Sequence, residues 1–364
     1  MRVKLWLPLI TGCAVCLWYF HYNGFLEPFL IARSEEKIIL FWTPFFGKPF
    51  VSRYLKECPE VLNCHTTNDR QLAGLADALI FHLSDLKWDD LPSDRKANQR
   101  YILFSHESAG HPQFNPSLHP FNDYFNWTMT VRSDSDVPWP YGQMVKNENS
   151  LDFPESDYAS VIKGKSKLIT WIVSNCATAS KREVYVKELQ KYAPVDIYGK
   201  CGTLDCPASQ HAECLKNMSR DYKFYLSLEN SACQDYITEK VWRILDHNLV
   251  PIVFKRSLVE KSLPPNSFIS LDDFPKGPKQ LADYLQYLNK NDSAYFEYLR
   301  WKTEGWSWTY QSPGHYIGVC RLCEMLHDKS LSAAHKSYAN ISDWFYTGFK
   351  CEVGIGERLS KGTS

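Results

Sequence analysis

The chain has 364 residues, of which 44% are hydrophobic and 15% aromatic, enough for two domains with packed cores. Its 41 Lys and Arg residues balance its 41 Asp and Glu residues, so its formal net charge is zero. No broad basic surface exists to attract nucleic acid, so we expect no nucleic-acid partner. Any anion-binding site must be local, built from a few cations and backbone N–H groups.

An uncharged apolar run from Leu5 to Phe20 follows Arg2 and Lys4. A cleaved signal peptide and a retained signal-anchor are both open interpretations. The run ends in bulky residues, including Trp18, which suit a membrane interface better than a cleavage site. We therefore expect a cytoplasmic tail at 1–4, a transmembrane signal-anchor at 5–22 and a stem at 23–36. This topology is that of a single-pass type II membrane protein whose remaining mass is lumenal.

The cysteines and glycosylation signals fit that compartment. Of 12 cysteines, Cys13 and Cys16 lie in the apolar run, which leaves an even number for disulfides in an oxidising lumen. Cys320 and Cys323 have zinc-like spacing, but no second pair or paired histidine follows, which disfavours zinc. Candidate N-glycosylation sequons occur at Asn126, Asn217, Asn291 and Asn340.

The chain divides into two alternating units. In the first, short apolar runs at 38–42, 78–83 and 101–104 are typical of parallel strands with helical crossovers. A turn-rich stretch from Pro138 to Gly164 is the candidate linker. We expect an α/β domain at 37–160, a second at 165–312, and a C-terminal segment at 313–364 that returns to the first.

The second unit has the same alternation. It predicts strands at 168–173, 195–198, 224–228 and 250–254, and helices at 182–192, 238–247 and 281–288. Two successive units of this kind predict two doubly wound, Rossmann-like domains that face one cleft.

The densest local chemistry lies between Tyr222 and Arg243, which read YKFYLSLENSACQDYITEKVWR. The pattern predicts a strand, a polar turn and an amphipathic helix. Ligands bind at the carboxyl ends of strands in such sheets, and a helix N-terminus suits a diphosphate. Lys240 would add a point charge there. A capped helix with an ordinary charged surface is the alternative that this pattern alone leaves open.

This stretch resembles the signature of the α1,3-fucosyltransferases, glycosyltransferase family 10, in an invertebrate-like form. The resemblance implies a GT-B fold and GDP-fucose as donor. Carried over by position, it implies a donor site at Asn230, Tyr236, Glu239 and Lys240. Residues 173–182, VSNCATASKR, are similar to a second family motif and imply that Arg182 is a further cation on the diphosphate.

A third similarity lies in the first unit, where residues 101–107 read YILFSHE. It implies that Glu107 is the general base that takes the proton of the acceptor hydroxyl. GDP is a good leaving group, so one carboxylate suffices. The neighbours His106 and His111 could tune Glu107, but lone histidines are more often structural, and they are left out of the catalytic set.

Residues 125–136, FNWTMTVRSDSD, also resemble the family. Asp134 and Asp136 form a D-x-D pattern that could indicate a metal site. The resemblance instead implies an acceptor-side segment without an obligatory metal, in which Arg132 pairs with a carboxylate. It also implies that Cys58 and Cys64 join Cys320 and Cys323, without fixing which joins which.

The resemblance implies an inverting enzyme that transfers L-fucose from GDP-fucose in α1,3 linkage to a GlcNAc residue of an N-glycan or related glycan. Protein O-fucosylation of a folded polypeptide and an inactive, lectin-like membrane protein are the alternatives. The expected partners are GDP-fucose, a glycan acceptor on a glycoprotein and the Golgi membrane. No obligatory cofactor is expected, and stimulation by a divalent cation is left open.

Overall fold

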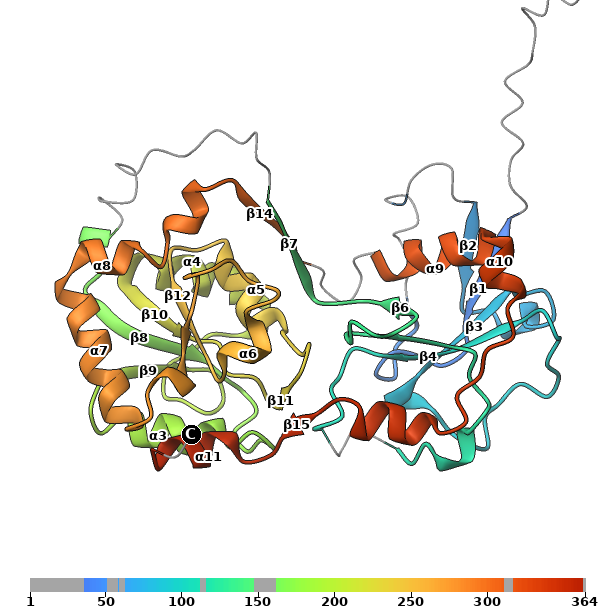
Figure 1. The fold of residues 1–364 in the computed structure, drawn as a ribbon, viewed down its shortest axis with the longest axis horizontal. Helices are drawn as coiled ribbons and strands as arrows, with labels where there is room; N and C mark the ends of the chain where they lie inside the picture. The colour runs from blue at the N-terminus through green and yellow to red at the C-terminus, as the bar shows by residue number, and fades with distance from the viewer. Residues whose placement is uncertain are drawn as a thin grey trace, which may run out of the picture.

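The computed structural model describes residues 36–50, 58, 63–111, 116–146, 162–310 and 317–362. Figure 1 shows two lobes, each built around one parallel sheet. Among these residues, no helix is both long and apolar enough to cross a bilayer. The expected tail, anchor and most of the stem, at 1–35, lie outside the described residues.

The first lobe holds a six-stranded sheet in the order β2-β1-β3-β4-β5-β6, with every neighbouring pair parallel. Its strands are β1 (Lys37–Phe41), β2 (Cys64–Thr67), β3 (Ala78–His82), β4 (Arg100–Ser105), β5 (Trp127–Thr130) and β6 (Val137–Pro138). Strands β3, β4 and β5 are buried throughout, which explains the apolar runs of β3 and β4 and why β5 alternates large apolar residues only with threonine.

The helical crossovers expected in this lobe are short 3-10 turns instead, within the part of the chain that the structure describes. These turns are Arg70–Leu72, Leu83–Asp85 and His119–Phe121. One face of the sheet is covered from far along the chain by α9 (Ile317–His327), whose Leu322 and Leu326 pack with Ile80 and Ile102. The short α10 (Lys329–Ala333) follows it.

The second lobe holds a five-stranded parallel sheet in the order β13-β12-β10-β8-β9. Its strands are β8 (Lys167–Ile172), β9 (Val195–Tyr198), β10 (Tyr222–Leu226), β12 (Val250–Val253) and β13 (Ile269–Ser270). Its helices are α3 (Arg182–Leu189), α4 (His211–Asp221), α5 (Glu239–Leu245), α6 (Arg256–Val259), α7 (Pro278–Lys290) and α8 (Asp292–Phe296). The four strands and three helices predicted here are present, with ends shifted by a few residues.

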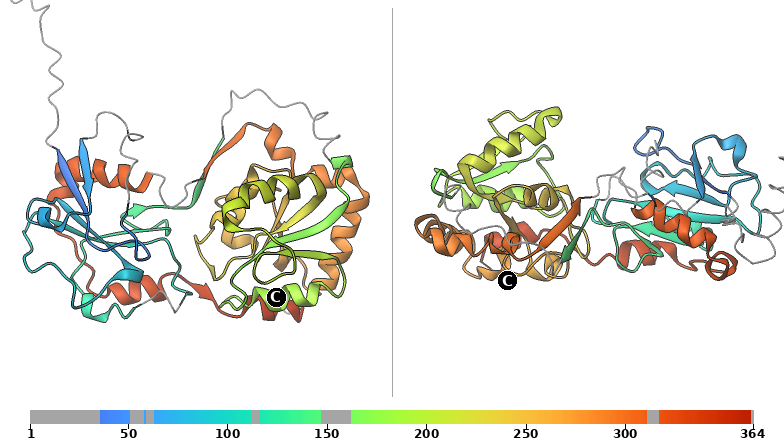
Figure 2. Two further views of the ribbon diagram at one scale, coloured as in Figure 1. Left: turned by 180° about the vertical axis from the view of Figure 1, so that it is seen from behind. Right: turned by 90° about the horizontal axis from the view of Figure 1, so that it is seen from above.

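Strand pairing and apolar packing both join the lobes. Strand β7 (Gly142–Lys146) pairs antiparallel with β14 (Trp306–Tyr310), as Figure 2 shows from behind. A shared apolar cluster joins Phe81 and Leu103 of the first lobe to Trp242 of the second. An added Cβ at Gly142 would lie 2.2 Å from the Trp242 ring, so only glycine permits this close approach.

The C-terminal segment departs from expectation. The sequence predicts that residues 313–364 return to the first lobe, and α9 does so. Strand β15 (Cys351–Glu352) instead pairs with β11 (Ala232–Cys233) of the second lobe. Helix α11 (Ile355–Ser360) then packs beside α3. Its backbone is bonded there, because the N–H groups of Gly354 and Gly356 donate to the carbonyls of Ala179 and Ser180 over 2.8 Å.

Five disulfides lie outside the apolar N-terminal run. Cys58 bonds to Cys320 and Cys64 to Cys323, which joins the four cysteines that the family resemblance grouped. The others are Cys176–Cys201, Cys206–Cys214 and Cys233–Cys351. His327 lies near Cys64 and Cys323, but those sulfurs are bonded to each other and are not available as thiolate ligands.

Candidate functional site

An open cavity of about 220 Å³ lies at the carboxyl ends of β8 and β10. Its polar lining residues come from the loop after β8, from α3, from the loop after β10, and from α4 and α5. They are Ser174, Asn175, Arg182, His211, Asn230, Glu239, Lys240 and Arg243. Four of the five expected donor-site residues therefore meet around one cavity, in the place where open parallel sheets bind ligands.

Arg182 forms the buried wall of this cavity. Its side chain is 3% exposed, and the guanidinium donates from Nη1 to the Leu228 carbonyl over 2.7 Å and from Nη2 to the Asn175 carbonyl over 3.1 Å. Within the described residues, its Nε–H has no hydrogen-bond partner. Burial lowers the pKa of Arg182, and nearby Glu229 opposes that shift. A buried donor without a partner favours an anionic or polar ligand here.

Asn230 presents a second unsatisfied group. Its side-chain Oδ1 is buried and has no partner among the residues that the structure describes. Its backbone carbonyl accepts from the Ser180 N–H over 3.0 Å, which fixes the loop. The amide can both donate and accept, so it suits a ligand with hydroxyl groups.

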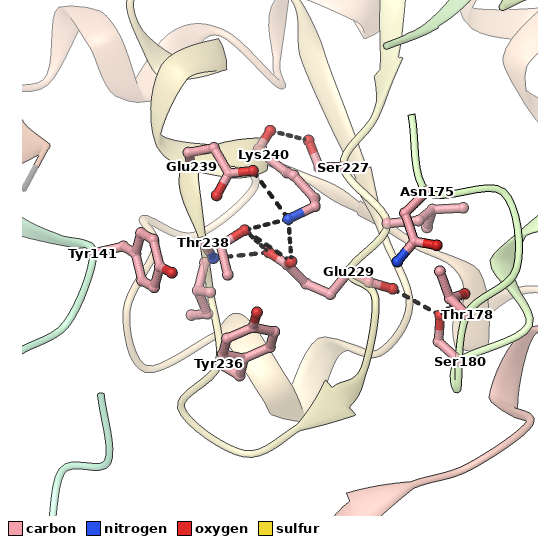
Figure 3. A network of polar contacts seen from close by, with 12 residues as sticks. Tyr141, Asn175, Thr178, Ser180, Ser227, Glu229, Tyr236, Thr238, Glu239 and Lys240 are labelled. Atoms are coloured by element: carbon pink, nitrogen blue, oxygen red, sulfur yellow. Dashed lines mark hydrogen bonds and ion pairs between the residues drawn. The ribbon is translucent and has the colours of Figure 1, made fainter. Parts of the chain in front are cut away.

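Lys240 is the centre of the polar network in Figure 3. Its ammonium lies 2.7 Å from Thr238 Oγ1, 3.0 Å from Glu229 Oε2 and 3.1 Å from Glu239 Oε1. An ammonium has three N–H donors, so these contacts occupy all of them. A diphosphate that approaches Lys240 must therefore share or displace one of these acceptors.

Charge accounts for the protonation states of this network. Burial opposes ionisation of Glu239, but Lys240 more than compensates and lowers the pKa of Glu239 to about 2. Burial raises the pKa of Glu229, and Lys240 only partly offsets this effect. Burial would lower the pKa of Lys240, yet the two carboxylates raise it, so Lys240 is a cation throughout the physiological range.

The backbone at the start of α5 differs from expectation. Free N–H groups at this helix end were expected to face a diphosphate. Instead, the Thr238 N–H donates to Glu229 Oε1 over 2.7 Å, and α5 has only seven residues. Glu229 thus takes the place of an anion at this end of the helix, and Arg182 and Asn230 are the cavity residues that still carry a polar atom without a partner.

Glu107 lies in the first lobe, two residues after the end of β4. Its backbone N–H donates to Ser105 Oγ over 3.1 Å, and its Oε2 accepts from the Tyr236 hydroxyl over 2.8 Å. Burial raises the pKa of Glu107, while Tyr236 and Lys240 lower it and Glu239 and Glu229 raise it further. A partly buried carboxylate with a raised pKa is suited to accept a proton.

Tyr236 is the expected donor-site residue that lies elsewhere. It does not line the cavity that holds Arg182 and Lys240. Tyr236 is buried, at 4% exposure, and its hydroxyl donates to the Glu107 carboxylate. A contact of Tyr236 with the donor remains a prediction, and the hydrogen bond to Glu107 is one that the sequence does not show.

His106 is a structural residue. Its ring is buried against Trp139, with 4.5 Å between ring centroids, and burial lowers its pKa to about 3. It is therefore neutral at physiological pH. His111 is also buried, and burial lowers its pKa.

The D-x-D carboxylates belong to separate contacts. Asp134 forms a two-pronged ion pair with Arg132, at 2.8 and 2.6 Å, so it is one of the two candidate partners of that arginine. Asp136 accepts from the Thr128 N–H and the Tyr338 hydroxyl and pairs with Lys336. Asp134 therefore pairs within the loop after β5, whereas Asp136 ties that loop to the segment of Lys336 and Tyr338.

The sequons differ in their surroundings. Asn217 and Asn340 are exposed, and Asn291 is half-buried and caps α8. The Asn126 side chain instead donates to the Lys336 carbonyl and accepts from the Tyr101 N–H, over 2.9 and 2.8 Å. Glycosylation of Asn126 would require these bonds to break.

Sequence reasoning missed the contribution of α4. His211 and Leu215 of this helix line the cavity, as does Arg243 near the end of α5. Leu215 and Met218 are the buried residues of α4, three positions apart, which is a helical spacing. That spacing was the available signal, but it is short and lies among polar and cysteine residues.

Comparison with known proteins gives consistent matches over both lobes. Residues 34–142 match the family described as "Fucosyltransferase, N-terminal", and residues 162–344 match "Glycosyltransferase family 10 (fucosyltransferase) C-term". Alpha-(1,3)-fucosyltransferase fut-1 of Caenorhabditis elegans is 38% identical over 304 residues, which are 81% of this chain and 66% of that protein. For fut-6 of the same organism the identity is 35%, over 90% of this chain and 84% of that protein.

Two further similarities extend this result. Alpha-(1,3)-fucosyltransferase C of Drosophila melanogaster is 32% identical over 92% of this chain and 84% of its own length. A crystal structure of an α1,3-fucosyltransferase superposes with a TM-score of 0.53 at 17% identity, covering 85% of this chain and 95% of that one. The structural similarity supports the same α/β fold with parallel sheets.

Proposed function

Because the chain belongs to glycosyltransferase family 10, the fucosyltransferases, we propose that it transfers L-fucose from GDP-fucose in α1,3 linkage to a GlcNAc residue of an N-glycan or related glycan, with release of GDP. The observation that carries the proposal is the cavity with two unsatisfied buried groups, Arg182 Nε and Asn230 Oδ1. The relatives named above are α1,3-fucosyltransferases, and their sequence similarity extends over most of this chain.

The donor would occupy the cavity between β8, β10 and α5. Three cations, Arg182, Lys240 and Arg243, and two carboxylates, Glu229 and Glu239, line or adjoin it, so the ionised set has a net charge of +1. That charge favours a nucleoside diphosphate. Arg182 and Lys240 would contact the phosphates, while Asn230 and Glu239 would bind hydroxyl groups of the donor.

The chemistry follows from the position of Glu107 on the opposite side of the cleft. The acceptor hydroxyl attacks the anomeric carbon of fucose as its proton passes to the Glu107 carboxylate. The bond between that carbon and the GDP oxygen breaks, and the configuration inverts. GDP leaves with the bonding electron pair, and Arg182 and Lys240 stabilise its negative charge. No general acid is needed, because GDP is a good leaving group.

The arrangement that we propose is of the GT-B type, with the acceptor on the lobe of Glu107 and the donor on the lobe of Arg182. The disulfides fit an oxidising lumen, which supports a Golgi enzyme held by a single-pass type II anchor at 5–22. Protease treatment of sealed Golgi vesicles tests this: the catalytic part should resist digestion until detergent is added. Digestion without detergent would contradict it.

The direct test is an assay of GDP-fucose transfer by the purified enzyme to defined N-glycans, N-acetyllactosamine acceptors and folded peptides. We expect fucose on a glycan acceptor, and transfer to a deglycosylated polypeptide would instead favour protein O-fucosylation. No transfer and no hydrolysis of GDP-fucose would favour the lectin-like alternative. Activity is expected to persist in EDTA, and loss that manganese reverses would establish a cation requirement.

Variants test the assigned roles. Glu107→Gln keeps the shape of the side chain but cannot accept the proton, so transfer should fall by a factor of about 100 or more while GDP still binds. Arg182→Ala and Lys240→Ala should weaken GDP binding in calorimetry. Unchanged GDP affinity in both would contradict the diphosphate site.

A further inference from the structure

The general base and the donor lobe share a direct hydrogen bond. The hydroxyl of Tyr236, 129 residues further along the chain, donates to Glu107 Oε2 over 2.8 Å. Tyr236 stands in the turn between β11 and α5, whereas Glu107 follows β4 of the other lobe. The base is therefore held partly by a residue of the lobe that carries the donor cavity.

The backbones around this bond are also close. An added Cβ at Gly110 would lie 2.8 Å from Ser231 Cβ and 3.3 Å from Cys233 Sγ, so the loop after Glu107 packs directly on the donor segment. Cys233 is bonded to Cys351, and β11 pairs with β15 at the same place. These contacts limit relative movement of Tyr236 and Glu107.

Tyr236 is built to act as a neutral donor. Its ring is 4% exposed and packs edge-on to Tyr141, at 6.4 Å between centroids. Burial, together with the negative charge of Glu107, raises the pKa of Tyr236 well above its ordinary value. The phenol therefore keeps its proton at working pH and can only donate it as a hydrogen bond to the carboxylate.

We propose that Tyr236 is a positioning residue for the general base: its hydroxyl holds Oε2 of Glu107, directs Oε1 to the acceptor hydroxyl and stabilises the ionised carboxylate. This inference rests on the proposed function of Glu107. The other charged groups that act on Glu107 are Lys240, which favours ionisation, and Glu239 and Glu229, which oppose it. Without the Tyr236 hydroxyl, only Lys240 would favour the ionised form of Glu107, against burial and the charges of Glu239 and Glu229. The pKa of Glu107 would therefore rise further.

The consequence is a base that depends on the contact between the lobes. The packing of Gly110 against Ser231 and Cys233 keeps Tyr236 within hydrogen-bond distance of Glu107. The orientation of the base and a bond that favours its charged form therefore both depend on a residue of the donor lobe.

The test is Tyr236→Phe in the intact enzyme. Without the hydroxyl the base is no longer held in position, so kcat should fall by a factor of about 10 to 100. The acidic limb of the kcat–pH profile should move to higher pH, because the carboxylate has lost a stabilising donor. GDP affinity in calorimetry should change less than about twofold. Tyr185→Phe, which removes a buried hydroxyl elsewhere in the donor lobe, is the matched control and should behave as wild type.

An isosteric variant guards against a folding defect. Replacement of Tyr236 by 3,5-difluorotyrosine keeps the hydroxyl but makes it a stronger donor, so the acidic limb should move to lower pH. Opposite shifts in the two variants would establish the positioning role. A wild-type kcat and profile in Tyr236→Phe, or weakened GDP binding with an unmoved acidic limb, would overturn it. Retained activity in Glu107→Gln would instead refute the proposed base itself.

Discussion

The ammonium of Lys240 lies 3.0 Å from Oε2 of Glu229, with the two side chains 17% and 10% exposed. Glu229 also accepts from the N–H and the hydroxyl of Thr238, so it links the strand β10 to the start of α5. Lys240, which we assign to donor binding, therefore also neutralises the charge of Glu229 inside the fold.

This pair predicts that Lys240→Ala destabilises the protein as well as impairing catalysis. Removal of one partner of a buried pair leaves the other charge uncompensated and costs about 3–5 kcal/mol. The double variant Glu229→Gln/Lys240→Met should recover much of the lost free energy of unfolding, measured by urea denaturation, but should not recover GDP binding. A double variant no more stable than Lys240→Ala would show that the pair is not coupled in this way.

Arg182→Lys should weaken GDP binding even though it keeps the positive charge. The guanidinium bonds two carbonyls and keeps Nε–H without a partner beside the cavity, an arrangement that a single ammonium cannot reproduce. We expect the Kd for GDP, measured by calorimetry, to rise by a factor of about 10 to 100. Equal affinity in the two proteins would indicate that only the charge matters.

Acidic pH should reduce transfer at a higher pH than an exposed glutamate would allow. Burial raises the pKa of Glu107 above its ordinary value of 4.5, and the base works only when ionised. The rate therefore falls as pH drops through this raised pKa. The profile of kcat/KM for the acceptor, at saturating donor, measures the limb, and full activity at pH 4.5 would contradict the assignment.

The same raised pKa predicts a stability difference. A carboxyl whose folded-state pKa is raised stabilises the fold below its unfolded pKa, and that contribution is lost as pH rises through the folded pKa. Glu107→Gln should therefore raise the melting temperature more at pH 7 than at pH 4. Equal changes at the two pH values would argue against a raised pKa.

Gly142→Ala should disturb the joint between the lobes. The added Cβ would lie 2.2 Å from the ring of Trp242, which is buried in the shared apolar cluster. Overpacking of this kind costs about 1–3 kcal/mol in the free energy of unfolding. Gly74→Ala, whose Cβ would have only Lys96 Nζ within 4 Å, is the matched control and should be nearly neutral in the same denaturation experiment.

Opening the Cys176–Cys201 disulfide should affect both stability and donor binding. The bonded residues are 25 apart, and closing a loop of this length is worth about 3 kcal/mol. Cys176 follows Asn175, whose carbonyl holds Arg182, so the Cys176→Ala/Cys201→Ala variant should bind GDP more weakly. Cys58→Ala/Cys320→Ala, in the other lobe, should leave the GDP affinity of the folded protein unchanged.

The sequence predicted the central strands of both sheets well, because β3, β4, β10 and β12 are buried throughout and each contains a run of apolar residues. Edge strand β2, with the sequence Cys-His-Thr-Thr, is only half-buried and carries no such pattern. Helix α9 packs on the first sheet through contacts between residues far apart in sequence, which local hydrophobic periodicity cannot predict.

The candidate site divides in the same way. Arg182, Asn230, Glu239 and Lys240 follow strands or begin helices of one sheet, so their convergence could be predicted from topology. The bond from Tyr236 to Glu107 could not, since it joins two lobes whose relative placement depends on packing around Trp242. The sequence also could not predict that Thr238, Glu229 and Glu239 occupy all three N–H donors of Lys240.

Because the chain returns to α3, Gly354 and Gly356 contact the segment that holds Arg182, although they are far from that residue in sequence. Gly356 packs against the backbone of Lys181, directly before Arg182, and an added Cβ would lie 2.3 Å from the Lys181 carbonyl oxygen. A nonsense mutation at any of codons 353–356 would therefore leave every assigned site residue encoded. It would nevertheless remove the contact of Gly356 with the Lys181 backbone that supports Arg182. We therefore expect the truncated protein to bind GDP weakly.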